Sequence, residues 1–205
     1  MIEPDEVRAL RGDLVLTGDL RLDVPRFLHQ HHCPETATHC AAVAAEARRV
    51  AALVGADEER AEHGGWLHDV SAIFPAAERV DVARRWGIDV LAEEASFPMI
   101  IHQKLSAALA SAIFDVHALE VLSAVGCHTT LKTDATLDDK VLFVADKLAW
   151  DQPGVPPYHQ EMADALRHGL DDAVRVYLQF LWEQRATLRV VHPWFRAAYD
   201  QLVLD

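Results

Sequence analysis

The sequence has 205 residues, a formal net charge of −13, and an apolar fraction of 51% beside 25% charged residues. This length is typical of one compact domain, and this composition excludes intrinsic disorder. The negative charge argues against nonspecific nucleic-acid binding, which needs a basic surface, and against docking on anionic lipid. The longest stretch without a charged residue, 121–131, has 11 residues, whereas a membrane span needs ~20.

The N-terminus and the cysteines favour a cytoplasmic protein. Residues 1–6 are acidic and lack an apolar core, so no signal peptide is expected. Cys33, Cys40 and Cys127 form no CxxC motif and cannot all pair, which is typical of reduced thiols. The expected partner is a small molecule, with no nucleic acid and no membrane, and a homodimer is left open.

Apolar residues recur at steps of three and four almost throughout, which predicts an all-α fold. Residues 1–33 are expected to form an N-terminal appendage with a small hairpin, in which strands Leu14–Leu16 and Leu20–Val24 flank a turn at 17–19. A long helix is predicted over 35–54, because Pro34 suits a first turn and Gly55 an exit.

The rest of the chain continues the helical pattern. A second helix opens with acids at 57–59, which complement the helix dipole, and runs to about Asp69. Further helices are predicted over 76–86, 99–114, 116–129, 137–149, 160–186 with a break near Gly169, and 194–203. The sequence therefore predicts a single helical-bundle domain over 34–205, preceded by the appendage.

Histidine is over-represented, with 12 of 205 residues, and most lie among apolar residues. A histidine-rich interior indicates metal ligation or acid–base chemistry, although each histidine alone also fits a structural role. The candidates that the helical map singles out are His39, the adjacent pair His68 and Asp69, His102, His128, and Asp146 within an apolar run.

The carboxylate of Asp146 needs a partner, because an isolated charge in a low-dielectric interior is very costly. Imidazole and carboxylate together suit Fe, Mn, Co, Ni or Zn better than Ca. Helical bundles build such sites from side chains of several helices. Asp69 has two oxygens and can bridge two ions.

The order His … His-Asp … His … His … Asp resembles that of the HD-domain metal-dependent phosphohydrolases, in particular the YqeK-like branch of symmetrical diadenosine tetraphosphate hydrolases. The resemblance covers roughly residues 34–203. The matching pieces are Thr38-His39-Cys40-Ala41-Ala42-Val43, Trp66-Leu67-His68-Asp69-Val70, Ile101-His102, Cys127-His128-Thr129-Thr130, Leu142-Phe143-Val144-Ala145-Asp146-Lys147 and Val191-His192-Pro193.

The resemblance implies an HD-type domain over 34–205 that binds two divalent or mixed-valent first-row transition metals, iron first and Mn, Co, Ni or Zn as alternatives. It implies one metal on His39, His68 and Asp146, a second on His102 and His128, and Asp69 as the bridge. A metal-bridging hydroxide would attack phosphorus, so no serine or cysteine nucleophile is needed. Asp69, His68 and Lys104 are then the expected catalytic residues.

The chain departs from the branch at positions on the substrate side. Thr36 stands where an arginine is common, Gln103 where a glycine is frequent, and 70–72 reads Val-Ser-Ala instead of Tyr-Ala-Lys after the HD pair. The chemistry is therefore predicted more firmly than the substrate.

All four lysines lie between 104 and 147, where arginine is absent. Lys104 and Lys132 follow ligand histidines closely and are expected to contact polyphosphate, with solvated surface charge as the alternative. Lys147 is expected instead to pair with an acid that lies outside the ligand set and supports it. Trp150 is a candidate for stacking a base, with core or interface packing as the alternative.

Other histidines are expected to lie outside the site, and Cys40 and Cys127 are expected to be small core residues. His192 matches the branch but is expected to anchor the C-terminal turn. The remaining ones are His29, His31, His32, His63, His117, His159 and His168.

The predicted reaction is symmetrical hydrolysis of diadenosine tetraphosphate to two ADP. A close alternative keeps the site but acts on a nucleoside triphosphate, a monophosphate or another phosphoester. A diiron oxygenase and a non-catalytic binding module are further alternatives, and the complete ligand set disfavours the binding module.

Overall fold

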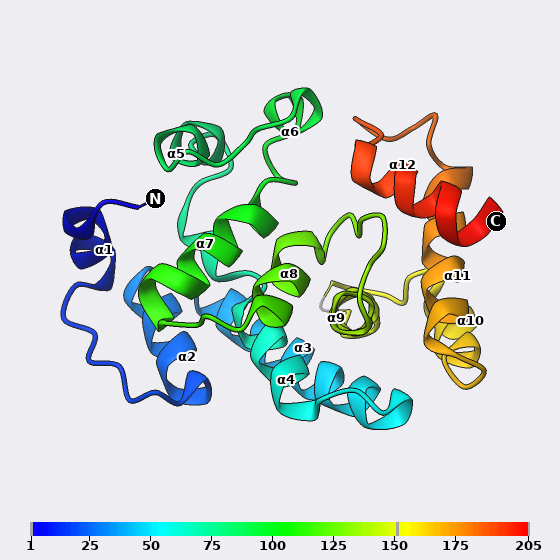
Figure 1. The fold of residues 1–205 in the computed structure, drawn as a ribbon, viewed down its shortest axis with the longest axis horizontal. Helices are drawn as coiled ribbons and strands as arrows, with labels where there is room; N and C mark the ends of the chain where they lie inside the picture. The colour runs from blue at the N-terminus through cyan, green and yellow to red at the C-terminus, as the bar shows by residue number, and fades with distance from the viewer. Residues whose placement is uncertain (1, 151, 205) are drawn as a thin grey trace.

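The computed structural model describes residues 2–150 and 152–204, and no strand occurs among them, which confirms the all-α prediction (Figure 1). The helices are α1 (Pro4–Arg11), α2 (Leu20–Gln30), α3 (Pro34–Val54), α4 (Glu58–Leu67), the 3-10 turn η1 (Val70–Ile73), α5 (Arg79–Arg85), α6 (Ala92–Ser96), α7 (His102–Phe114), α8 (Leu119–Cys127), α9 (Leu137–Leu148), α10 (His159–Ala165), α11 (Leu170–Glu183), α12 (Pro193–Tyr199) and the π-helical turn η2 (Asp200–Leu204).

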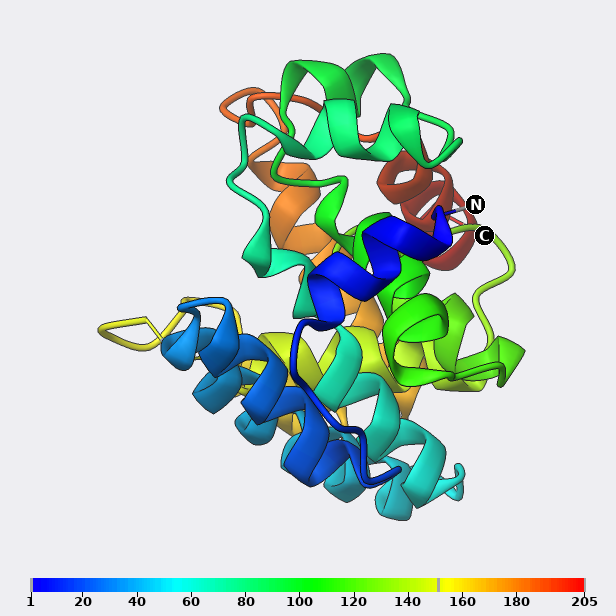
Figure 2. The ribbon, with the colours of Figure 1, turned by 90° about the vertical axis from the view of Figure 1, so that its left-hand side faces the viewer.

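The centre of the fold is a bundle in which α3 packs against α4 and α9, while α8 packs against α4, α7 and α9. In Figure 1, α3 and α4 form the lower layer and α9 is seen along its axis between α8 and the C-terminal helices α10 to α12. Figure 2 shows α5 and α6 together at the end of the molecule opposite α3 and α4. Five helices from distant parts of the chain therefore meet in one core.

Local signals at helix ends account for most boundaries. Pro34 occupies the first turn of α3, and Gly55 ends the helix in the left-handed region at φ 72°. The side chain of Asp57 caps α4 by accepting from the Arg60 amide at 2.9 Å. The predicted break near Gly169 is confirmed, because it separates α10 from α11.

The predicted hairpin is wrong. Leu20–Val24 lies within α2, and the preceding residues form the loop that starts this helix. The buried carboxylate of Asp23 accepts hydrogen bonds from the Thr17 amide, the Thr17 hydroxyl and the Gly18 amide. The Thr17-Gly18-Asp19 sequence, which resembles a hairpin turn, is therefore an N-terminal helix cap.

Helix α2 contributes to the same core as α3, since the side chains of Val24, Phe27 and Leu28 are fully buried. The segment expected to be an appendage thus supplies one wall of the bundle through α2. Within the described part of the chain, no helix combines the length and apolarity that crossing a bilayer requires.

Helices α3 and α4 cross in close contact at Gly65. A Cβ atom at this position would lie 2.4 Å from the Ala44 Cα and 2.6 Å from the Ala44 amide nitrogen, both backbone atoms. Only glycine allows this approach. The Gly65 carbonyl also accepts a hydrogen bond from His68 Nδ1 at 2.8 Å, so the crossing sets the position of this histidine.

We expect Gly65→Ala to lower the free energy of unfolding by about 3 kcal/mol or more, because the methyl group forces two backbones apart. Gly64→Ala is the matched control: its Cβ would meet only the Leu142 side chain, at 3.3 Å, and alanine favours the helix by roughly 1 kcal/mol. Urea unfolding of both variants measures the difference. Equal midpoints would contradict a backbone crossing at position 65.

Candidate metal centre

Six side chains converge where α3, α9 and the ends of α4, α7 and α8 meet. Two lie within helices α3 and α9, two directly follow α4, one begins α7 and one directly follows α8. We call this set the six-residue cluster: His39, His68, Asp69, His102, His128 and Asp146.

The donor atoms of the cluster form two overlapping groups. His39, His68 and Asp146 make one, and His68, Asp69 and His128 make the other, with ligand atoms within 4.8 Å of one another in each. The Oδ1 atom of Asp146 lies 3.4 Å from His39 Nε2 and 3.7 Å from His68 Nε2. The structure thus brings together all six residues that the sequence singled out as ligands.

Three histidines of the cluster share one local arrangement. The Nδ1 atom of His68 contacts the carbonyl of Gly65 at 2.8 Å, and that of His128 contacts the carbonyl of Val125 at 2.8 Å. The Nδ1 atom of His102 contacts the carbonyl of Met99 at 2.5 Å. A carbonyl can only accept, so each Nδ1 carries the proton and each Nε2 presents its lone pair to the cluster.

This arrangement fits a metal ion. His68 Nε2 is buried and has no hydrogen-bond partner among the described residues. The Nε2 atoms of His102 and His128 face each other at 2.9 Å, although both are acceptors in the tautomer fixed above. Two imidazole nitrogens bound at right angles to one ion, each about 2.1 Å from it, are also about 3 Å apart. A shared cation turns this repulsive contact into a favourable one.

The two oxygens of Asp69 face different parts of the cluster. Its Oδ2 lies 3.6 Å from His68 Nε2, whereas its Oδ1 lies 3.1 Å from His102 Nε2 and 3.7 Å from His128 Nε2. A carboxylate placed in this way can bridge two ions, as expected from the sequence.

The protonation states also suit metal binding. Burial alone raises the pKa of Asp146, but the Lys147 ammonium and a hydrogen bond from His39 hold it well below its usual range. The pKa of Asp69 is lowered against the same effect of burial by His68 and other cluster histidines. Burial, with neighbouring imidazoles, lowers the pKa of His128, so this ring is neutral. In these states the two carboxylates and His128 need lose no proton to bind an ion.

Lys147 joins the two halves of the cluster. Its buried ammonium donates to Asp146 Oδ2 at 2.8 Å and to the carbonyl of His128 at 2.6 Å. Lys147 therefore pairs with an acid, as expected, but that acid is the predicted ligand Asp146 and not one that supports the ligands from outside. Because Oδ2 is held in this way, Asp146 presents Oδ1 alone to His39 and His68.

The cluster opens into a pocket of about 240 Å³, which we call the metal pocket. Aromatic side chains of Trp150, Tyr158 and Tyr177 form part of its lining. Burial raises the pKa of Tyr158 to about 12 and also raises that of Tyr177. Both phenols are therefore protonated donors at neutral pH. Trp150 lies where the proposed stacking on a base is sterically possible, and its side chain is partly exposed.

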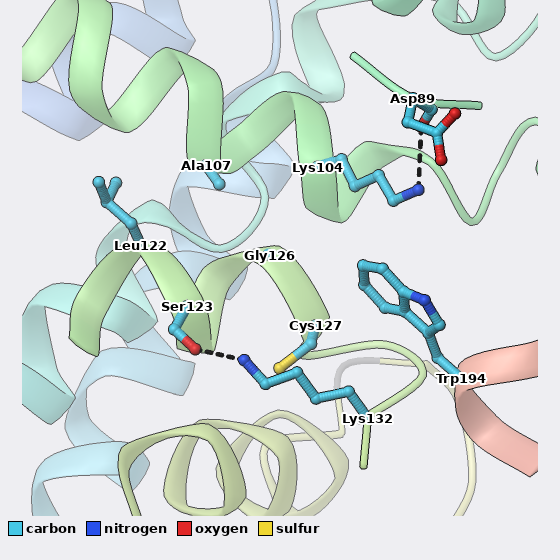
Figure 3. A pocket seen from close by; sticks show the side chains of 9 residues that line it. All are labelled: Asp89, Lys104, Ala107, Leu122, Ser123, Gly126, Cys127, Lys132 and Trp194. Atoms are coloured by element: carbon cyan, nitrogen blue, oxygen red, sulfur yellow. Dashed lines mark hydrogen bonds between the residues drawn. The ribbon is translucent and has the colours of Figure 1, made fainter. Parts of the chain in front are cut away.

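Lys104 and Lys132 lie in another cavity, of about 410 Å³, where Figure 3 shows them reaching in from different sides. Lys104 pairs with the fully buried Glu94 at 2.8 Å, and Lys132 pairs with the fully buried Asp139 at 3.2 Å. Among the described residues that line the metal pocket, neither lysine occurs. The structure therefore does not bring Lys104 to the catalytic groups or either lysine to phosphate there, because buried carboxylates hold both elsewhere.

Two of the positions that depart from the YqeK-like branch, Gln103 and Ser71, have structural roles. The side-chain oxygen of Gln103 accepts from the amides of Thr129 and Thr130, just after His128, at 3.1 and 3.3 Å. The Ser71 hydroxyl donates to the carbonyl of His102 at 2.9 Å. These bonds fix the backbone beside two ligands. Apart from the unusual residue types, no sequence pattern indicated these contacts.

The histidines expected outside the site lie outside the six-residue cluster. His31 bonds the carbonyl of Leu10, and His192 caps α12 by accepting from the Trp194 amide, which confirms its role as an anchor. Cys40 and Cys127 are buried, as predicted for small core residues.

Comparisons with known proteins show what the chain is similar to. The HD domain model matches residues 36–151. The uncharacterized protein in the pepC 5′ region of Lactococcus lactis subsp. cremoris is 40% identical over 138 residues, which cover 67% of this chain and 70% of that protein. The symmetrical bis(5′-nucleosyl)-tetraphosphatase of Staphylococcus aureus is 26% identical over 138 residues, 66% of this chain and 68% of that enzyme.

A crystal structure of a predicted HD superfamily hydrolase involved in NAD metabolism, from Clostridium acetobutylicum, superposes with a TM-score of 0.79. The match covers 100% of this chain and 98% of that one at 18% identity. At this identity the likeness establishes the fold.

We expect Asp69→Ala to lose bound metal and turnover while the helical fold persists, since one carboxylate would be removed from two ions. Asp81→Ala is the control, because that carboxylate is 79% exposed on α5. Elemental analysis, circular dichroism and the formation of ADP from diadenosine tetraphosphate give the three readouts. Two metals per chain and full activity in the Asp69 variant would show that the ligands are wrongly assigned.

We expect Lys104→Met to lower the free energy of unfolding by about 3 kcal/mol at pH 7, because it leaves the Glu94 carboxylate buried without its cation. Lys140→Met is the control. Its partner Asp171 is 47% exposed, and such a pair contributes about 1 kcal/mol or less.

The Lys104 effect should shrink on acidification. Burial raises the pKa of Glu94, but hydrogen bonds from His192 and Lys104 bring it below its ordinary value. The pair therefore stabilises the protein above the ordinary carboxyl pKa and ceases to do so as the pH falls below it. A raised Michaelis constant for polyphosphate at unchanged stability would instead favour a substrate contact.

Proposed function

This chain belongs to the HD domain family of metal-dependent phosphohydrolases, and we propose that it is a dimetal enzyme that cleaves diadenosine tetraphosphate symmetrically to two ADP. The observation that carries the proposal is the convergence of the six-residue cluster, with the two Asp69 oxygens facing different ligands. A cytoplasmic location and a free nucleotide substrate go with this proposal.

The geometry supports the following division of ligands. His39, His68 and Asp146 would hold one ion, and His102 and His128 the other, with Asp69 shared. Such a pair of first-row ions polarises a phosphoryl oxygen and lowers the pKa of a water molecule. We favour iron because of the family resemblance. Manganese, cobalt, nickel and zinc are alternatives, because these ions also accept a mixture of imidazole and carboxylate ligands.

The chain's own groups complete the site for a phosphate substrate. Lys147 offsets the charge of Asp146, so two divalent ions would leave the cluster with a net positive charge. The phenol groups of Tyr158 and Tyr177 line the same pocket and are protonated at neutral pH, so they are donors for phosphoryl oxygens.

A substrate with two nucleoside ends is supported by the pockets around the cluster. One neighbouring pocket, of about 600 Å³, shares His39 and Trp150 with the metal pocket. Another, of about 190 Å³, shares Met99, Thr129 and Tyr177 with it. A polyphosphate chain across the metals can therefore carry a nucleoside on each side. The relative named as a symmetrical tetraphosphatase supports the same substrate.

Two alternatives keep the same ligands. A nucleoside triphosphate or monophosphate would occupy one flanking pocket only. A diiron oxygenase would use a mixed-valent iron pair and consume oxygen with an organic substrate, without releasing phosphate.

We expect the metal-loaded protein to convert diadenosine tetraphosphate to ADP as the only nucleotide product, faster than it attacks ATP, AMP or a chromogenic phosphodiester. Only the dinucleotide fills both flanking pockets. Each ~1.4 kcal/mol of binding free energy that the second nucleoside adds in the transition state should raise kcat/KM about tenfold over that of a mononucleotide. Chromatography of the products on this panel is the measurement, with Asp69→Ala as the inactive control.

The products separate the alternatives. ATP plus AMP would contradict symmetrical cleavage. Equal rates on every substrate would contradict the specificity for a dinucleotide. Oxygen uptake without cleavage of any phosphate ester or anhydride would favour the oxygenase.

A further inference from the structure

The pocket of about 190 Å³ beside the metal pocket is enclosed mainly by apolar side chains, and we call it the side pocket. Its walls come from the turn at 97–100, from α11, and from residues 188–195 ahead of and within α12. Ile100, Leu181, Val190 and Phe195 are representative lining residues. No part of the catalytic chemistry proposed above uses these residues.

The side pocket adjoins the metal ligands directly. Thr129 lines both pockets, and its hydroxyl oxygen lies 3.2 Å from His102 Nε2. Met99 also lines both, and its carbonyl holds the Nδ1 atom of His102. A group bound in the side pocket is therefore separated from the six-residue cluster only by the residues that line both pockets.

The size and lining of the side pocket select a flat, apolar ring system. Pockets for drug-sized ligands usually measure about 300–1,000 Å³, so 190 Å³ suits a single ring system and excludes a whole nucleotide. The Arg189 guanidinium already lies over the Phe97 ring, 5.2 Å from its centroid, at the edge of the pocket. Aromatic and guanidinium planes of this kind are the partners on which bases stack.

The wall of the side pocket is braced before any ligand binds. His192 Nδ1 accepts from the Trp194 amide, so Nε2 carries the proton and donates to the buried Glu94 at 3.3 Å. Glu94 is held in turn by the Leu91 amide and by Lys104. A preformed pocket loses little free energy in ordering when its ligand arrives.

We propose that the side pocket binds one purine base of the substrate and leaves the attached phosphates to reach the metals past Thr129. This inference rests on the proposed function for the identity of the ligand. It assigns residues 97–100, 181 and 188–195 as determinants of specificity for a nucleoside.

Adenosine is the probe, because it carries a base and no phosphate and so needs no contact with the metals. We expect saturation-transfer NMR on the zinc-loaded protein to show transfer from protein methyl groups to adenine H2 and H8. Val190→Trp, which fills the pocket, should weaken the transfer clearly, because adenosine can then occupy only the other flanking pocket. Thr187→Trp is the matched control, because Thr187 is exposed in the same segment and outside the pocket lining.

Kinetics give the second readout. Val190→Trp should raise the Michaelis constant for diadenosine tetraphosphate at least tenfold while its rate on a chromogenic phosphodiester without a base stays unchanged. Leu181→Ala should raise the same constant severalfold by removing a wall, and it serves if the tryptophan variant does not fold.

The outcomes distinguish the inference from the proposed function. Unchanged adenosine transfer and unchanged kinetics in folded Val190→Trp and Leu181→Ala would overturn the side pocket as a base site, while cleavage by the wild type would leave the proposed function standing. Loss of adenosine transfer only in Trp150→Ala would place the base in the other flanking pocket and also overturn the inference. Adenosine transfer that Val190→Trp weakens and Thr187→Trp leaves unchanged would support it even if diadenosine tetraphosphate were not cleaved.

Discussion

The structure depends on the gathering of two carboxylates and four imidazoles in one largely buried space. Charges and lone pairs cannot be buried at this density without compensation. The chain itself supplies part of this compensation. The Lys147 ammonium neutralises Asp146, and three backbone carbonyls accept hydrogen bonds from the Nδ1–H groups of the histidines. The metal-binding atoms of the cluster lie close to one another, and a pair of metal ions would compensate for their burial.

The bundle is arranged to satisfy this demand. Helices α4 and α8 both end immediately before a histidine of the six-residue cluster, so the imidazole Nδ1 caps a carbonyl in the last turn of its own helix. The glycine crossing of α3 and α4 then brings His39 and His68 to the same carboxylate. The elements of secondary structure and the ligand set are therefore positioned by the same contacts.

Most helices and all members of the six-residue cluster could be predicted from the sequence, because helix periodicity and the order of histidines and aspartates are local properties of the chain. Pro34, Gly55 and Gly169 mark boundaries that the structure confirms. The hairpin was wrong because the Asp23 carboxylate, six residues further on, turns an apparent strand connection into a helix start. The positions of Lys104 and Lys132 could not be predicted, because their partners Glu94 and Asp139 become neighbours only in the folded chain.

The carbonyl contacts of the three histidines have a consequence for how the protein acquires its ions. Rings pinned at Nδ1 cannot swing to enlarge or shrink the coordination space, so the chain has little means of adjusting its geometry to favour one first-row ion over another. Discrimination then falls to the intrinsic order of affinities and to the free concentration of each ion. The metal content of the protein would accordingly record the supply available when it folded.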